Sequence, residues 1–449
     1  MASPLDSFLS ANSFVVLDGG LGSELEAQGA DLSNHLWSAS LLLSNPSLIR
    51  ETHLAYYQAG ADVVTSASYQ ASVEGFRVRS VKAQITRKGI DEGKAKELLL
   101  LSVKLAVEAR DRFWQEYQQR ISVADVPPLS PQLSSAPLCR SCVTVKPEEP
   151  GRSSDFGVDV RLRPLVAASI GCYGAAQADG SEYRGDYGAR VGLSGLKEKY
   201  KQQLDVLVGA DGVDLFMFET IPCLEEARAA LSMLEDFKPR IKAVISVSCK
   251  DSQHLRSGEN LRDFASLIWP RQAAQGSSYD DTTTIPEGLV GVGVNCVSPT
   301  CVEGALQTIS AAAQESCHRK RPTIKSFSDS SRQPGAVRIA PKMCNGIRII
   351  VPGVESVGDV KPPDIALVAY PNSGEEWDSV SRKWLPGTGL EGGSCPSGVE
   401  EFGRFARDEW WAAGARVIGG CCRTRPAHIA ELRKALSAAA ARDARCQSS

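Results

Sequence analysis

The sequence predicts an α/β protein built as a single (β/α)8 barrel with three polar surface insertions. Short apolar runs alternate eight times with stretches of helical composition, and this alternation predicts parallel strands joined by helices. Outside the polar segments, these units take up roughly 250 to 300 residues, a size typical of a closed eight-stranded barrel. We expect one domain over residues 1–449 with its core at about 14–437. An open doubly wound sheet is the alternative.

The predicted strands are apolar runs bounded by turn residues. In chain order they cover residues 14–18, 61–66, 165–171, 213–220, 243–247, 289–296, 364–374 including a loop, and 415–418. A helix is predicted after each strand from helical spacing and from start and stop signals. The helices cover residues 47–58, 93–119, 193–208, 224–237, 261–269, 300–313, 399–413 and 427–436. Residues 1–13 are short and polar and receive no element.

Three polar segments interrupt the pattern, and we interpret them as insertions on the barrel surface. They lie at about residues 121–160, 270–287 and 318–345 and are rich in polar residues with little periodicity. The first contains Cys139 and Cys142 as a Cys-x-x-Cys pair. That spacing allows a second metal site or a redox pair, but no partner pair or strand–helix context supports either.

The charge balance argues against two classes of partner. The chain has 50 Lys and Arg against 53 Asp and Glu, a formal net charge of -3. We therefore expect no nucleic-acid partner and no membrane partner, and no apolar run approaches the roughly 18–20 residues of a membrane span. Thirteen cysteines, an odd number in a long chain without a signal sequence, favour a reducing, cytoplasmic location.

Three cysteines stand at the ends of predicted strands. Cys421 and Cys422 follow Gly419 and Gly420 directly after the last strand, and Cys296 ends the sixth. The two glycines give the backbone freedom to bend, so that adjacent side chains can aim at one point. Three thiolates with a free fourth position suit a tetrahedral zinc ion. The alternative is that they are ordinary buried cysteines.

Other polar residues also fall at strand ends, where a barrel gathers its chemistry. They are Asp18, Thr65, Ser66, Glu219 and Asn372. Asp18 and Glu219 could instead be turn or helix-capping carboxylates. As site residues, they would suit a cationic amino group on a substrate or a cationic donor.

A zinc ion with three sulfur ligands is a poor activator of water and a good holder of a fourth thiolate. A substrate thiol bound there would lose its proton near neutral pH. Alkyl transfer from a sulfonium to this thiolate fits both the metal and the carboxylates, because it neutralises opposite charges. A zinc lyase or hydrolase remains an alternative, although the five histidines are scattered and end no predicted strand. A non-catalytic zinc-binding protein is another.

Six ordered motifs resemble the zinc-dependent homocysteine S-methyltransferases. They cover residues 17–21, 62–70, 218–222, 293–296, 370–374 and 419–424. The resemblance implies Zn²⁺ held by Cys296, Cys421 and Cys422, with the sulfur of L-homocysteine as fourth ligand and methionine as product. It implies that Asp18 and Glu219 recognise the amino end of homocysteine, and that Asn295 and Asn372 line the site. Thr65 and Ser66 are further candidate substrate contacts.

The loop at residues 370–377 and the segment 182–185 look more like the branch that uses a sulfonium donor, S-methylmethionine or S-adenosylmethionine. A betaine-type or other thiol alkyltransferase on the same barrel is the alternative. The resemblance implies no cobalamin or folate module, because the barrel uses the whole chain. The insertions leave the donor and the oligomeric state open, and we expect a monomer or small homo-oligomer.

Overall fold

The structure, a computed structural model, describes most of the chain between residues 3 and 448. The described ranges are residues 3–32, 36–82, 90–123, 161–177, 179–269, 285–318, 365–375, 377–378, 383–385 and 398–448. Most of each expected insertion lies outside these ranges, and so do Cys139 and Cys142.

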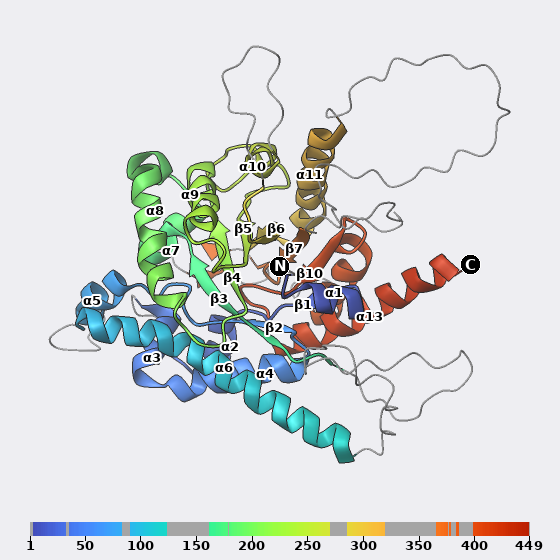
Figure 1. The fold of residues 1–449 in the computed structure, drawn as a ribbon, viewed down its shortest axis with the longest axis horizontal. Helices are drawn as coiled ribbons and strands as arrows, with labels where there is room; N and C mark the ends of the chain where they lie inside the picture. The colour runs from blue at the N-terminus through green and yellow to red at the C-terminus, as the bar shows by residue number, and fades with distance from the viewer. Residues whose placement is uncertain are drawn as a thin grey trace, which may run out of the picture.

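Eight parallel strands form the centre of the molecule, surrounded by helices (Figure 1). The strands are β1 Val15–Val16, β2 Val63–Thr65, β3 Leu165–Gly171, β4 Leu215–Ile221, β5 Ala243–Val247, β6 Leu289–Asn295, β7 Ala366–Tyr370 and β10 Ala415–Ile418. Their order is β1-β10-β7-β6-β5-β4-β3-β2. A short antiparallel pair, β8 Trp377–Asp378 and β9 Lys383–Trp384, follows β7.

The two ends of this sheet meet, and the sheet becomes a barrel. Leu17 forms a parallel bridge with Val63. The Asp18 amide donates to the Val63 carbonyl at 3.0 Å, and the Asp62 amide donates to the Val16 carbonyl at 2.7 Å. This pairing confirms the predicted barrel and excludes the open doubly wound sheet.

The helices follow the expected alternation. Those that come after strands are α2 Leu21–Ala27, α3 Leu41–Ser44, α4 Pro46–Ala59, α5 Val73–Lys82, α6 Glu92–Val123, α7 Tyr173–Gln177, α8 Gly188–Leu207, α9 Leu224–Asp236, α10 Leu261–Ile268, α11 Pro299–His318, α12 Gly398–Phe405 and α13 Pro426–Ser448. Three shorter helical turns are η1 Trp37–Ser40, η3 Ser181–Tyr183 and the π-helical η5 Ala406–Trp410. None of the helices in the described residues is long and apolar enough to cross a membrane.

The bounds of α4 show how local sequence sets an element. The Asn45 side chain accepts a hydrogen bond from the Leu48 amide, and Pro46 occupies the first turn, where its missing N–H removes no helical bond. The helix ends at Gly60, whose φ of 113° lies in the left-handed region that glycine adopts without strain.

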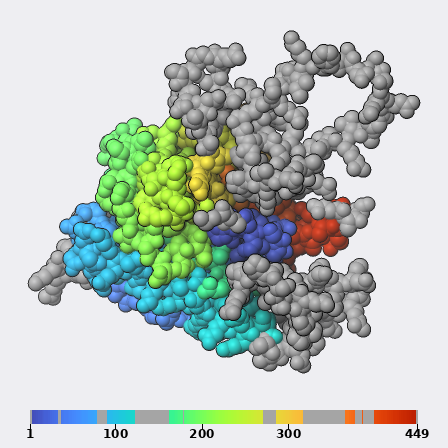
Figure 2. Space-filling model, viewed as in Figure 1, coloured from blue at the N-terminus to red at the C-terminus, as the bar shows by residue number. Residues whose placement is uncertain are grey.

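The barrel interior is filled by side chains. Helix α1 (Asp6–Asn12) packs against the end of the barrel where the strands begin. Leu5 and Phe8 are buried and belong to the same cluster as interior strand residues such as Met217 and Val244. In Figure 2 the N-terminal residues, in dark blue, lie in the middle of the face shown. Residues 1–13 were expected to form no element. That was wrong, because seven helical residues are too few for their spacing to be recognised.

Candidate metal and substrate site

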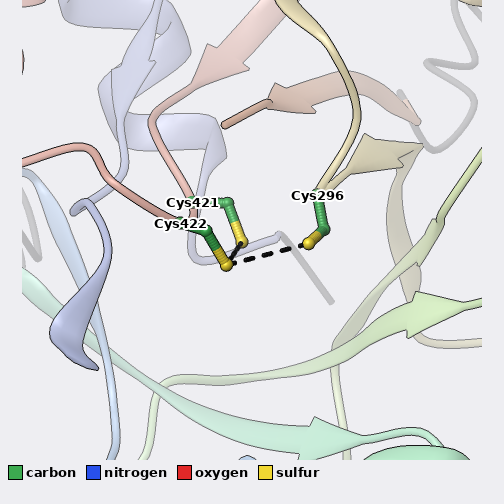
Figure 3. A group of neighbouring side chains, drawn as sticks. All are labelled: Cys296, Cys421 and Cys422. Carbon is green, nitrogen blue, oxygen red and sulfur yellow. Dashed lines mark hydrogen bonds between the residues drawn. The ribbon is translucent and has the colours of Figure 1, made fainter. Parts of the chain in front are cut away.

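Cys296, Cys421 and Cys422 meet at the barrel mouth (Figure 3). Cys296 follows β6 and the other two follow β10, and both strands pair with β7. The Cys422 sulfur lies 3.9 Å from that of Cys296 and 4.0 Å from that of Cys421, and all three lie within 4.8 Å of one another. With Zn–S bonds of about 2.3 Å, the sulfurs of a tetrahedral site lie about 3.8 Å apart. The donor set therefore fits a thiolate metal site.

Cys296 leaves its strand through an unusual backbone conformation. Its φ of 53° lies in the left-handed region, where a non-glycine residue is uncommon. The carbonyl of Cys296 accepts hydrogen bonds from the Ser248 hydroxyl at 3.3 Å and from the Arg256 guanidinium at 3.2 Å. Its amide donates to the Tyr370 carbonyl at 3.3 Å. These bonds hold the turn that directs the thiol toward the other two.

Gly419 and Gly420 are required for space. Neither has a positive φ, so the freedom expected of them is not what the turn uses. A Cβ on Gly420 would lie 2.2 Å from the Thr424 hydroxyl oxygen, and one on Gly419 would lie 2.5 Å from the Leu17 Cβ. The Thr424 hydroxyl donates to the Cys421 carbonyl at 2.7 Å. Close packing against Leu17, directly after β1, and against Thr424 thus fixes the two cysteines.

The three thiols share their protons unequally. Hydrogen bonds from the Cys421 and Cys422 thiols hold the pKa of Cys296 well below its usual value. Hydrogen bonding to Cys296 raises the pKa of Cys421. A hydrogen bond from the Asn372 side chain also lowers the pKa of Cys296. The cluster thus favours an anionic sulfur, which is the form that binds a metal.

The thiols open into a cavity of about 730 Å³, within the size range of cavities that hold small ligands. Six of the described residues that line it are acidic, and none is Lys, Arg or His. The acidic residues are Asp18, Glu26, Asp31, Asp179, Glu182 and Glu219. The cavity is therefore suited to a cationic ligand.

Asp18 lies at the end of β1 and lines the cavity. One of its carboxyl oxygens accepts from the Thr65 amide at 2.8 Å, and the Thr65 hydroxyl donates to the same oxygen at 3.0 Å. Burial nevertheless raises the pKa of Asp18 to about 8, because burial disfavours the charged form more than these bonds favour it. A cationic group would restore the charge.

Glu219, on β4, is the second buried carboxyl of the cavity. Ser169 donates a hydrogen bond to it, and burial raises the pKa of Glu219 to about 7. The next residue, Thr220, has a φ of 62°, which is strained for a β-branched side chain. Asn295 holds this conformation, because its amide accepts from the Thr220 amide at 2.8 Å and donates to the Thr220 hydroxyl at 2.7 Å.

The expected substrate contacts fall into two groups. Asp18, Thr65, Ser66 and Glu219 line the cavity together with the three cysteines. Asn295 and Asn372 are not among the lining residues: Asn295 supports Thr220, and Asn372 lies against the Cys296 thiol. A direct contact of these two amides with substrate stays a prediction.

Sequence reasoning assigned no site role to several residues that form the cavity walls. Trp37, Gln70, Glu182 and Tyr183 line the cavity from loops that follow β1, β2 and β3. No periodicity marks such loop residues. Two signals were available. Gln70, Glu182 and Tyr183 lie in the segments 62–70 and 182–185 that carry the family resemblance, and loops after barrel strands lie at the same end as the strand ends.

The fold and the site define a (β/α)8-barrel protein in which a three-thiol centre, able to hold a metal, faces an acidic cavity. The family model described as homocysteine S-methyltransferase matches residues 15–436. The chain belongs to this family and is a methyltransferase.

Similar proteins span nearly the whole chain. It is 33% identical over 431 residues to homocysteine S-methyltransferase 1 of Zea mays, covering 96% of this chain and 97% of the relative. It is 32% identical over 430 residues to homocysteine S-methyltransferase YbgG of Bacillus subtilis, covering 96% of each. The solved structure of the metallated homocysteine methyltransferase MmuM of Escherichia coli has a TM-score of 0.60 and 28% identity, covering 96% of this chain and 99% of that one.

Proposed function

We propose that this enzyme transfers a methyl group from a sulfonium donor, S-methylmethionine or S-adenosylmethionine, to the thiol of L-homocysteine, with Zn²⁺ held by Cys296, Cys421 and Cys422. The observation that carries the proposal is the grouping of these three sulfurs within 4.8 Å in the lining of the acidic cavity. The metallated form of the Escherichia coli relative supports a metal in this family.

The chemistry of the donor set favours zinc. Three thiolate ligands suit zinc, whereas Mg²⁺ and Ca²⁺ prefer oxygen ligands. When bound, the zinc would hold the homocysteine sulfur as a thiolate near neutral pH, where a free thiol with a pKa of about 8.5 is mostly protonated. Cys172, Cys296 and Cys421, among the cysteines in the described part of the chain, form no disulfide, which supports a reducing compartment, and we propose the cytosol.

Asp18 and Glu219 would bind the ammonium group of homocysteine. Both are buried carboxyls in the same cavity as the thiols, and repulsion from Glu219 adds to the burial that raises the pKa of Asp18. An ammonium group between them would offset that repulsion. Thr65 would keep Asp18 in place through its two hydrogen bonds, and Ser66 would contribute to the cavity wall beside it.

The cavity charge supports a cationic donor. With six carboxyls and no basic side chain among the described lining residues, it would attract a sulfonium and repel a polyanionic donor such as a folate. In the transfer, the bond from the sulfonium sulfur to its methyl carbon breaks and a bond from the homocysteine sulfur to that carbon forms. A neutral thioether leaves, and the thiol proton has already gone to solvent. The protein aligns the two sulfurs and excludes water.

The proposal is tested by supplying zinc-loaded enzyme and homocysteine with S-methylmethionine, S-adenosylmethionine or betaine in separate reactions. We expect methionine from at least one sulfonium and none from betaine, and we expect chelation of the zinc to stop the reaction. Methionine formed from betaine alone would indicate a betaine-type enzyme. Full zinc occupancy without turnover on either sulfonium would indicate a zinc-binding protein that is not this enzyme.

A further inference from the structure

The cavity lining comes from two parts of the barrel. We call the strand ends, with the residues that directly follow them, the floor, and the loops beyond them the wall. Asp18 and Glu219, at the ends of β1 and β4, belong to the floor with the three cysteines. Glu182 lies in η3, within the connection between β3 and α8, and belongs to the wall. The proposed homocysteine contacts use the floor, so the wall is left for the second substrate.

Two hydrogen-bond acceptors on this wall lack a donor among the described residues. They are Oε2 of Glu182 and Oε1 of Gln70. Glu182 is only 8% exposed, and both residues line the cavity. A buried acceptor without a partner is costly, and a buried carboxylate more so. What this wall lacks is a group with several N–H donors and a positive charge.

The loop that carries Glu182 is held firmly at both ends. The buried carboxylate of Glu226 accepts from the Tyr173 amide at 2.6 Å and from the Tyr187 hydroxyl at 2.5 Å. The rings of Tyr173 and Tyr187 lie 5.1 Å apart. Because Glu226 ties the two ends together, Glu182 is preorganised before any ligand arrives.

Within the loop, close packing fixes the position of Glu182. A Cβ on Gly174 would lie 2.4 Å from the Glu182 amide nitrogen, so the loop crosses directly over α7. The Arg256 guanidinium lies 5.9 Å from the Tyr183 ring centre and also bonds the Cys296 carbonyl. This arginine links the wall to the thiol centre.

We propose that Glu182, assisted by Gln70, binds the α-ammonium group of the methyl donor. The inference rests on the proposed function and adds the donor's recognition site to it. An ammonium group supplies the N–H donors and the positive charge that the wall lacks. A quaternary ammonium or a simple trialkyl sulfonium lacks N–H groups and leaves the two acceptors unpaired. Glu182 therefore selects a sulfonium that carries an amino-acid end.

The test compares donors with and without the ammonium group on zinc-loaded wild-type enzyme, Glu182→Gln and Asp186→Asn. Asp186→Asn is the matched control, because Asp186 lies in the same loop, is exposed and pairs with Arg184 at 3.1 Å. The probes are S-methylmethionine and its analogue without the amino group. Their binding is measured by calorimetry with L-homoserine, which has no thiol, occupying the floor.

We expect wild type and Asp186→Asn to bind S-methylmethionine roughly 10- to 100-fold more tightly than the analogue, as a charge-assisted hydrogen bond implies. In Glu182→Gln this ratio should fall to a few-fold, while the affinity for homocysteine alone stays within about two-fold. An unchanged ratio in Glu182→Gln, or equal binding of both probes by wild type, would overturn the assignment.

The binding measurement is independent of turnover and separates this inference from the proposed function. If the ratio behaves as expected but wild type forms no methionine from sulfonium donors, the proposed reaction fails and the recognition site stands. If methionine forms and the ratio is unaffected by Glu182→Gln, the reaction stands and the recognition site fails. A correctly folded Glu182→Gln variant is verified by its unchanged zinc content.

Discussion

Two residues at the barrel mouth, Thr220 and Cys296, have left-handed backbone conformations with φ of 62° and 53°. Such conformations cost about 1–3 kcal/mol each and persist only where surrounding bonds impose them. Asn295 bonds Thr220 through both ends of its amide, and Ser248 and Arg256 bond the Cys296 carbonyl. The polar residues behind the cavity therefore maintain the positions of Glu219 and the Cys296 thiol.

Glu219→Gln separates the substrate role from the metal role. We expect homocysteine affinity to fall by roughly 10-fold or more, because the ammonium loses a charged partner in a buried site, while zinc content stays unchanged. Calorimetry and metal analysis of the same sample measure both. Unchanged homocysteine affinity would remove Glu219 from the substrate site. Glu225→Gln, on the partly exposed start of α9, is the control for loss of one charge.

Asp18 predicts a pH dependence of ligand binding. Its pKa is raised to about 8 by burial, so in the empty cavity the carboxyl is mostly protonated at pH 6 and gains charge as the pH rises. Repulsion from Glu219, whose own pKa is raised by burial to about 7, also raises the pKa of Asp18, whereas the Thr65 hydrogen bonds lower it. The affinity for L-homoserine, which has no thiol to titrate, should therefore increase between pH 5.5 and 7.5. In Asp18→Asn the increase should be shallower; equal slopes would contradict this account.

At the scale of the element, α1 acts as a plug for the barrel interior. Phe8 is 2% exposed and packs with residues of the barrel's interior cluster. Phe8→Ala should lower the free energy of unfolding by about 3–5 kcal/mol, as in other large-to-small core substitutions. Urea denaturation measures this, with the exposed Ser10→Ala as control. A loss below about 1 kcal/mol would mean that α1 does not contribute to the core.

The bounds of individual strands and helices show what the sequence could predict. The bounds of β3 and β5 match the prediction because both strands are apolar apart from one serine each and are buried on both faces. The helix expected over 399–413 instead divides into α12 and the π-helical η5. There the Trp411 amide donates to the Ala406 carbonyl, five residues earlier, and both Trp410 and Trp411 become buried. A π-helical turn holds one residue more than an α-helical turn, so a hydrophobic pattern of period 3.6 does not predict it.

At the scale of the molecule, the barrel brings together residues that lie far apart in the sequence. Cys296 and Cys422 reach 3.9 Å because β6 and β10 both pair with β7. Once eight strands are predicted, the rule that strand ends share one rim is sufficient to group the cysteines with Asp18 and Glu219. The wall residue Glu182 could not be placed in this way, because its position depends on loop packing against Gly174 and on Glu226.

The most direct test of the central claim is X-ray absorption at the zinc edge of the purified enzyme, before and after addition of homocysteine. The account predicts three sulfur neighbours at about 2.3 Å in the absence of homocysteine and four in its presence. Cys296→Ala should lose most of the bound zinc. A zinc ion with mainly nitrogen or oxygen neighbours, or a sulfur count that homocysteine leaves unchanged, would contradict it.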